Sequence, residues 1–336
     1  MVGLANRLTA TEDPPFLRFA RPTLLLCLAA AIFLPGCRRG EAPSIGAVLL
    51  QEDQFFRMVE RGMRETAAQA GLAATVETSR NSPNEEERLV RSFIVRRMKA
   101  IVISPTSREG SVRPLREAHD RGIQIIAYDT PLAADFPACY VESDQYALGS
   151  STGKLCRRYI EERLGGKARI AVLAYTALNA DSSGRRVKGF RDEVSKLPGV
   201  EFVAQQDAWL PPQADTAASA ILRKHTDLDI IWAANEGGTA GAVTAVISAG
   251  RVGKVVVFGT DISRQLADFL LADDNVLQAV TAQQAHQIGV LAMQAAIDIL
   301  AEKPVEKIIR LPGLLYARAE PEKVRAYKDE LDQLLR

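Results

Sequence analysis

The chain has 336 residues, of which 25% are charged, and its formal net charge is +1 at pH 7. Acidic and basic residues are interspersed, which excludes the strongly basic surface typical of nucleic-acid-binding proteins and the polybasic patch typical of proteins that bind membrane surfaces. The length is sufficient for two compact lobes that each bury a core, and the histidines and cysteines have no metal-site spacing. We therefore expect neither a metal nor another cofactor, and we also expect the protein to be a monomer.

The first predicted element is an export signal. Residues 18–37 contain two arginines, an apolar stretch of about 15 residues and the tetrapeptide Leu34-Pro35-Gly36-Cys37. Such a stretch is too short to cross a hydrocarbon core of ~30 Å as a helix. The tetrapeptide resembles the end of bacterial lipoprotein signals, apart from the proline, and the resemblance implies that Cys37 carries a lipid.

We therefore expect residues 1–36 to be a lipoprotein signal peptide that is removed and residues 37–43 to be a linker. The protein would be exported to the periplasm or cell envelope and held at a membrane by its lipid. An uncleaved membrane anchor is the alternative interpretation.

After the leader, apolar runs of strand length alternate with amphipathic segments of helical spacing. In the first series, Asp53 is expected to cap a helix that ends at Gly71. The predicted strands are 44–51, 73–77, 100–104, 124–128 and 139–143, and the later helices are 84–97 and 112–121. This alternation is typical of parallel sheets covered by helices.

A second series of similar length follows Asp144. Its predicted strands are 169–174, 201–205, 229–233, 255–259 and 276–281, followed by a helix near 288–302, an extended segment at 308–311 and a charged helix from Glu320. Two such series predict an α/β protein with two Rossmann-like lobes, each with its own parallel sheet. Ligands of such sheets bind beyond the carboxyl ends of the strands.

Polar and aromatic side chains follow six of the predicted strands. They are Asp53, Phe55, Phe56, Asp129, Trp209, Asn235, Asp261 and Gln283. Carboxylates and amides can pair with the hydroxyl groups of a polyol, and an aromatic ring can lie against the C–H face of a sugar. Adjacent helical positions cannot face one direction, so we expect one of the two phenylalanines to face the cleft and the other to face the core.

The order and spacing of these segments resemble the periplasmic sugar-binding proteins of ABC importers, of the ribose-binding, type I class. The resemblance covers residues 44–311. It is carried by Phe55-Phe56 with Gly62, Ile103-Ser104-Pro105-Thr106, Ile126 to Asp129, Ser143-Asp144 with Gly149, Arg186 to Phe190, Ala234-Asn235-Glu236, Phe258 to Asp261, and Ala282-Gln283 with Gln287-Ile288-Gly289.

The resemblance implies that the eight residues named above line a ligand cleft. It also implies three crossings between the lobes, near Ser143, Gln283 and Pro312. The N-terminal lobe would then comprise residues 44–143 plus 284–312, and the C-terminal lobe residues 144–283 plus 313–336. Closure of the lobes around a sugar-like ligand would present the protein to a membrane permease, or alternatively to a sensor kinase.

The chain departs from the ribose-binding pattern at three positions. Asp53 replaces an asparagine, Thr130 replaces an arginine, and the position of a further arginine falls on Gly184, next to Arg185. In this register the cleft loses two guanidinium groups and gains a carboxylate, which favours a donor-rich ligand such as another sugar, an amino sugar or a cationic polyol. In a register shifted by one residue, Arg185 would itself enter the cleft.

Two other classes of protein share parts of this pattern. Gly149 to Gly153 matches the G-x-S-x-G motif of serine hydrolases, for which Ser151, Asp261 and His286 would be the triad. That motif requires a strand running directly into the serine, whereas a polar segment precedes this one, so we expect no catalysis. Effector domains of lactose-repressor-type regulators have similar lobes, but a DNA-binding helix-turn-helix precedes their first strand.

Two questions about individual residues stay open at this stage. Asp53, Asp129 and Asp261 could together bind a cation instead of sugar hydroxyls, although we expect no metal site. Cys139 and Cys156 could form a disulfide in an oxidising compartment, or they could be two separately buried thiols.

Overall fold

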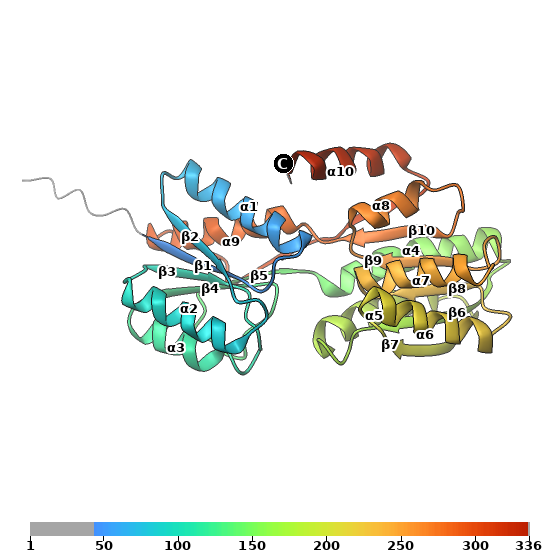
Figure 1. Cartoon of the computed structure of the whole chain (residues 1–336), viewed down its shortest axis with the longest axis horizontal. Helices are drawn as coiled ribbons and strands as arrows, with labels where there is room; N and C mark the ends of the chain where they lie inside the picture. Colours follow the sequence, from blue (N-terminus) through green and yellow to red (C-terminus); the bar gives the residue numbers. More distant parts are fainter. Residues whose placement is uncertain (1–43, 335–336) are drawn as a thin grey trace, which may run out of the picture. The chain divides into compact units, whose positions relative to one another are not determined.

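The computed structural model describes residues 44–334, which contain two six-stranded sheets flanked by helices (Figure 1). The predicted signal peptide, Cys37 and the linker lie outside these residues. The prediction of an α/β fold with two Rossmann-like lobes is confirmed.

The first lobe is built on a sheet in which all strands are parallel, in the order β11-β5-β4-β3-β1-β2. Its strands are β1 (Ile45–Leu49), β2 (Ala74–Thr78), β3 (Ala100–Ile103), β4 (Gln124–Tyr128), β5 (Cys139–Ser143) and β11 (Ile308–Leu311). Its helices are α1 (Gln54–Gln69), α2 (Pro83–Val95), α3 (Val112–Asp120) and α9 (Ala285–Leu300).

Alternation along each strand divides the first lobe's core between the two faces of the sheet. In β3, Ala100 and Val102 pack in one cluster with α1 and α9, whereas Ile101 and Ile103 pack in another with α2 and α3. Both faces are therefore covered, which explains why this strand is a continuous apolar run.

The second lobe has the sheet order β12-β10-β9-β8-β6-β7, with only β12 antiparallel to its neighbour. Its strands are β6 (Lys167–Ala174), β7 (Gly199–Asp207), β8 (Ile230–Ala233), β9 (Val256–Thr260), β10 (Leu277–Ala282) and β12 (Leu314–Ala317). Its helices are α4 (Gln145–Arg163), α5 (Ala180–Val194), α6 (Pro211–Lys224), α7 (Glu236–Ser248), α8 (Arg264–Leu271) and α10 (Pro321–Leu334).

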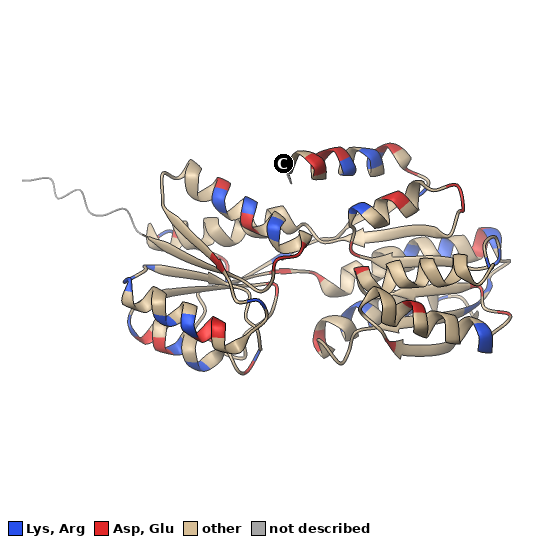
Figure 2. Ribbon diagram, viewed as in Figure 1, with Lys and Arg blue, Asp and Glu red and all other residues tan. Residues whose placement is uncertain are grey.

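The chain passes between the two sheets three times, from β5 to α4, from β10 to α9 and from β11 to β12. The three predicted crossings are therefore present. None of the helices within residues 44–334 combines the length and the apolar character needed to span a membrane. Lysine, arginine, aspartate and glutamate are dispersed over both lobes (Figure 2).

Two helix pairs approach closely at glycines. A Cβ atom on Gly289 of α9 would lie 2.0 Å from the carbonyl oxygen of Val59 in α1, and one on Gly149 of α4 would lie 1.9 Å from that of Arg186 in α5. Gly149 is therefore a packing residue of two crossing helices. Because Ser151 lies inside α4, the G-x-S-x-G match is not a nucleophile turn.

Cys139 and Cys156 are free and buried, so the disulfide alternative is wrong. Cys139 lies in the core of the first lobe and Cys156 in the core of the second lobe, and residues that pack in separate cores cannot be bridged. Burial raises the pKa of Cys139 to about 11 and that of Cys156 well above its usual range, so both thiols stay protonated at neutral pH.

Candidate ligand-binding cleft

A cavity of about 1090 Å³ lies between the two lobes, at the carboxyl ends of strands from both sheets. Eight of the nine candidate ligand residues line it: Asp53, Phe55, Phe56, Asp129, Trp209, Asn235, Asp261 and Gln283. The ninth, Arg185, does not. Parallel sheets place the residues that follow their strands at one edge, which is how eight positions distant in sequence reach a single cavity.

Asp129 projects from the end of β4 in the first lobe. Its backbone is left-handed, with φ of +59°, a conformation that residues other than glycine seldom adopt. The Tyr140 hydroxyl donates a hydrogen bond of 2.7 Å to the Asp129 carbonyl oxygen and so holds this turn. Among residues 44–334, only the Ser104 hydroxyl donates to the carboxylate, at 3.4 Å, and burial raises the pKa of Asp129 to about 6.

Asp261 occupies the matching place at the end of β9 in the second lobe, also with a left-handed backbone (φ +66°). Its Oδ2 accepts from Nη1 of Arg186 at 3.1 Å and from the backbone N–H of Glu236 at 3.3 Å. Its Oδ1 accepts from Nε2 of Gln283 at 2.9 Å. Two carboxylates in the same unusual conformation thus come from opposite lobes, but within the described part of the chain only Asp261 has a cationic partner in contact.

Arg186 is the cleft arginine that the sequence analysis missed. It is 4% exposed, its Nε donates to Oε1 of Gln145 at 2.7 Å, and Nη1 also donates to the carbonyl oxygen of Ala234 at 2.9 Å. Although burial disfavours the charged guanidinium, the carboxylate of Asp261 raises the pKa of Arg186 above its usual value. The side chain is therefore a fixed cation in the wall of the cleft.

The predicted register at this helix is wrong. Gly184 is exposed, and Arg185 pairs with Glu142 at 3.4 Å and with Asp181 at 3.6 Å instead of entering the cavity. The buried positions of α5 include Ser182, Ser183, Arg186, Val187 and Phe190. Their helical spacing, anchored on Phe190, selects position 186, so α5 supplies one guanidinium group to the cleft.

Aromatic rings line the cavity from both lobes. Phe55 is half-buried, whereas Phe56 belongs to the core of the first lobe, and their rings meet edge to face at 5.0 Å between centroids. Trp209 lies on the opposite side and packs against the core of the second lobe. Phe55 and Trp209 are thus the rings best placed for contact with the face of a ligand.

Asp53 and Asn235 have structural roles in addition to lining the cavity. Oδ1 of Asp53 accepts from the Phe56 N–H at 3.0 Å and caps α1, and Oδ1 of Asn235 accepts from the Gly238 N–H at 3.2 Å and caps α7. Nδ2 of Asn235 also donates to the carbonyl oxygen of Trp209 at 2.9 Å. Substitution of either residue would therefore disturb a helix start as well as the cavity.

Gln283 lies on the crossing from β10 to α9. While its Nε2 donates to Asp261, its Oε1 is buried and accepts no hydrogen bond from the described residues. A buried acceptor without a partner costs about 1–3 kcal/mol. The amide oxygen is thus available to a hydroxyl group of a ligand.

The alternative catalytic and metal sites are not assembled. Nε2 of His286 lies 2.8 Å from Oε2 of Glu65, and Asp261 is paired with Arg186, so neither residue is available to Ser151. Within residues 44–334, no three histidine, cysteine, aspartate or glutamate side chains are grouped as metal ligands.

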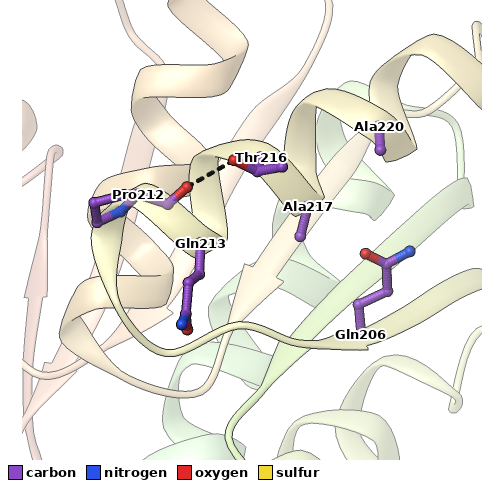
Figure 3. A pocket seen from close by; sticks show the side chains of 6 residues that line it. All are labelled: Gln206, Pro212, Gln213, Thr216, Ala217 and Ala220. Atoms are coloured by element: carbon purple, nitrogen blue, oxygen red, sulfur yellow. Dashed lines mark hydrogen bonds between the residues drawn. The ribbon is translucent and has the colours of Figure 1, made fainter.

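A second, shallow hollow lies beside α6 (Figure 3). Its lining residues are Gln206, Pro212, Gln213, Thr216, Ala217 and Ala220. It has no charged or aromatic side chain, and the hydroxyl group of Thr216 is already bonded to the carbonyl oxygen of Pro212 at 2.9 Å. We therefore place the candidate site in the cleft.

Residues 47–304 match the family model described as a periplasmic binding protein domain. The chain belongs to the periplasmic binding protein family. Members of this family are substrate-binding proteins and not enzymes, and membership implies export to the periplasm.

Similar family members include transport proteins of other bacteria. The chain is 27% identical to the ABC transporter periplasmic-binding protein YphF of Escherichia coli over 91% of its own length and 95% of the relative. It is 29% identical to the D-ribose/D-allose-binding protein of Pseudomonas aeruginosa, over 79% and 85%. A solute-binding protein from Actinobacillus succinogenes, solved with bound D-allose, has the same fold, with a TM-score of 0.76, 24% identity and coverage of 84% and 99%.

Proposed function

We propose that this periplasmic binding protein captures a small hydroxylated ligand, a monosaccharide or sugar derivative, for an ABC importer. The observation that carries the proposal is the pair Asp129 and Asp261. They come from opposite lobes, have the same left-handed backbone and line one cavity. Related proteins named for ribose, allose and apiose support a sugar as the ligand class.

Each group of side chains has a separate role in this proposal. The carboxylates of Asp129 and Asp261 and the amide oxygen of Gln283 accept hydrogen bonds from ligand hydroxyl groups, Arg186 donates to a ligand oxygen, and the rings of Phe55 and Trp209 cover its C–H faces. Binding on one lobe followed by closure about the crossing strands would bring both sets of groups onto the ligand, with no chemical step.

The charges around the cavity favour a neutral or cationic ligand over an anionic one. Six acidic residues line it, namely Asp53, Glu109, Asp129, Asp181, Glu236 and Asp261, against the two basic residues Arg108 and Arg186. The buried one of these bases, Arg186, is already paired with Asp261. A sugar phosphate or sugar acid would bring a further negative charge beside unpaired carboxylates, so we expect such ligands to bind weakly.

A thermal-unfolding screen against neutral monosaccharides, amino sugars, polyols and sugar phosphates tests the proposed ligand class. A ligand present at 100 times its dissociation constant should add about 2.7 kcal/mol to the free energy of unfolding, and we expect this for at least one neutral or amino sugar. Stabilisation only by sugar phosphates would contradict the charge argument. Stabilisation by none of the panel would contradict the sugar assignment.

We also propose that the exported protein is anchored by a lipid on Cys37, as the Leu34 to Cys37 tetrapeptide suggests. Cells fed radiolabelled palmitate should incorporate label into the protein, and the Cys37→Ser variant should incorporate none and leave the membrane fraction. A Cys27→Ser variant is the matched control, because Cys27 lies within the predicted signal and should not affect labelling. Equal labelling of the Cys37→Ser variant would exclude this anchor.

A further inference from the structure

The C-terminal helix of the second lobe contacts the first lobe beside the cleft. Nε2 of Gln54, in the first turn of α1, donates to the Tyr327 hydroxyl of α10 at 3.1 Å. That hydroxyl donates in turn to the carbonyl oxygen of Ile262 at 3.3 Å, in the loop after β9. A second link follows one turn or more along both helices, where Nη1 of Arg61 donates to the carbonyl oxygen of Gln333 at 3.1 Å.

Apolar packing accompanies these hydrogen bonds. Val324, Tyr327 and Leu331 fix α10 in the core of its own lobe. Met58 of α1, one turn after Gln54, packs against the cores of both lobes. The contact thus joins two helices that are each firmly attached to a different sheet, so a displacement of one lobe relative to the other must change it.

Gln54 and Tyr327 also line the ligand cavity, and Gln54 directly follows the α1 cap Asp53. Helix α10 begins after the third crossing and lies beyond residues 47–304, which match the family model. Through Tyr327, the C-terminal segment therefore contributes to the wall of the cleft.

An ion pair also joins the lobes, at a different place in the fold. Arg185 of the second lobe meets Glu142 of the first, but Glu142 lies in the crossing strand β5 and also pairs with Arg310 of the crossing strand β11. That pair belongs to the hinge itself. Gln54 and Tyr327 lie on helices away from the crossing strands, where they can restrict the angle between the lobes.

We propose that Gln54 and Tyr327 are positioning residues of the binding cleft, which fasten α1 to α10 and hold the lobes of the ligand-free protein at the separation that accepts the ligand. We call the contact between Gln54 and Tyr327 the clasp. When the clasp is broken, the two lobes can move apart. The fraction of molecules ready to bind then falls, and the apparent dissociation constant rises by the same factor. One ordinary hydrogen bond corresponds to a change of about two- to tenfold in such an equilibrium.

The test compares two near-isosteric variants of the full-length protein with a matched control. Tyr327→Phe removes only the hydroxyl, and Gln54→Met keeps the length of the side chain but removes its donor. Tyr316→Phe is the control, since its ring contacts that of Tyr327 at 5.2 Å between centroids but its hydroxyl makes no lobe-to-lobe hydrogen bond to any of residues 44–334. The radius of gyration of the ligand-free protein is measured by small-angle X-ray scattering, and ligand affinity by calorimetry with the sugar that gives the largest thermal shift.

We expect a larger radius of gyration without ligand for Tyr327→Phe and Gln54→Met, and unchanged scattering for Tyr316→Phe. Each of the two variants should weaken binding about two- to tenfold, and the double variant should lose no more than Tyr327→Phe alone, because both substitutions remove the same hydrogen bond between the lobes. Unchanged scattering in both variants, or additive losses of affinity, would overturn the proposal.

The inference rests on the proposed function only in treating the cavity as the ligand site. The scattering measurement needs no ligand, so it distinguishes failure of the clasp from failure of the sugar assignment. If the variants expand without ligand but the protein binds no sugar, the role of the clasp is supported and only the proposed ligand class is rejected.

Discussion

We expect Asp261→Ala to lower the free energy of unfolding by about 3–5 kcal/mol and to abolish ligand binding. The substitution leaves the buried guanidinium of Arg186 without the carboxylate that neutralises it, and an uncompensated buried charge is costly. It also removes the acceptor of Gln283, which lies on a crossing between the lobes. Urea denaturation without ligand and calorimetry with ligand measure the two effects.

Two further substitutions test whether the loss of stability comes from the charge of Asp261 and from its location in the fold. Asp261→Asn keeps the volume and one acceptor oxygen, so the free energy of unfolding of this variant should lie between those of the wild type and Asp261→Ala. Asp268 is an exposed aspartate of α8, paired with Lys328, and Asp268→Ala should change stability by less than about 0.5 kcal/mol. Equal stability of the Asp261→Ala and Asp268→Ala proteins would show that the pair with Arg186 contributes little.

Ligand affinity should fall as the pH is lowered through about 6. Burial raises the pKa of Asp129 to about 6, against the attraction of Arg186, and the carboxylates of Asp261 and Asp53 add to the increase. Below this pKa the carboxyl group is protonated in the ligand-free protein and accepts hydrogen bonds poorly, so binding has to release the proton. The dissociation constant should then rise by up to about tenfold per pH unit below 6 and stay level above it.

The carboxyl group of Asp129 should make the stability of the folded protein depend on pH in the opposite direction. Its ordinary pKa of 3.8 applies to the unfolded chain, so between about pH 4 and 6 the folded protein holds a proton that the unfolded chain has lost. The contribution of Asp129 to the free energy of unfolding is therefore greatest below pH 4 and is lost as the pH rises through 6. Asp129→Asn should remove both dependences, and an affinity that is constant from pH 5 to 7 would contradict the assignment.

Much of the fold follows from local patterns in the sequence. Apolar runs gave the places of ten strands, because a strand buried on both faces excludes polar residues, as in Ala100–Ile103. Caps such as Asp53 marked helix starts, since a side-chain acceptor is needed there. The strand β12 was not predicted, because four residues directly after a crossing carry too short a pattern and its pairing with β10 is antiparallel and distant in sequence.

The cleft was predicted less completely than the sheets. Residues that directly follow strands, such as Asp129 and Asp261, could be found because the strand end fixes their position at the sheet edge. Arg186 lies on a helix, where a displacement of two residues turns a side chain by about 200°, so counting from a motif placed the arginine wrongly. The spacing of the buried residues of α5 identifies position 186, but only if Phe190 is taken as buried and the positions are counted from it.

Periodicity and chain order were sufficient to predict the two series of strands and helices, the two lobes and most of the residues at the cleft. The packed structure was needed to show that Cys139 and Cys156 lie in separate cores, that Arg186 pairs with Asp261, and that α10 meets α1. Each of these facts concerns residues from distant parts of the chain. Their separation depends on how whole sheets and helices pack, and no local pattern contains that information.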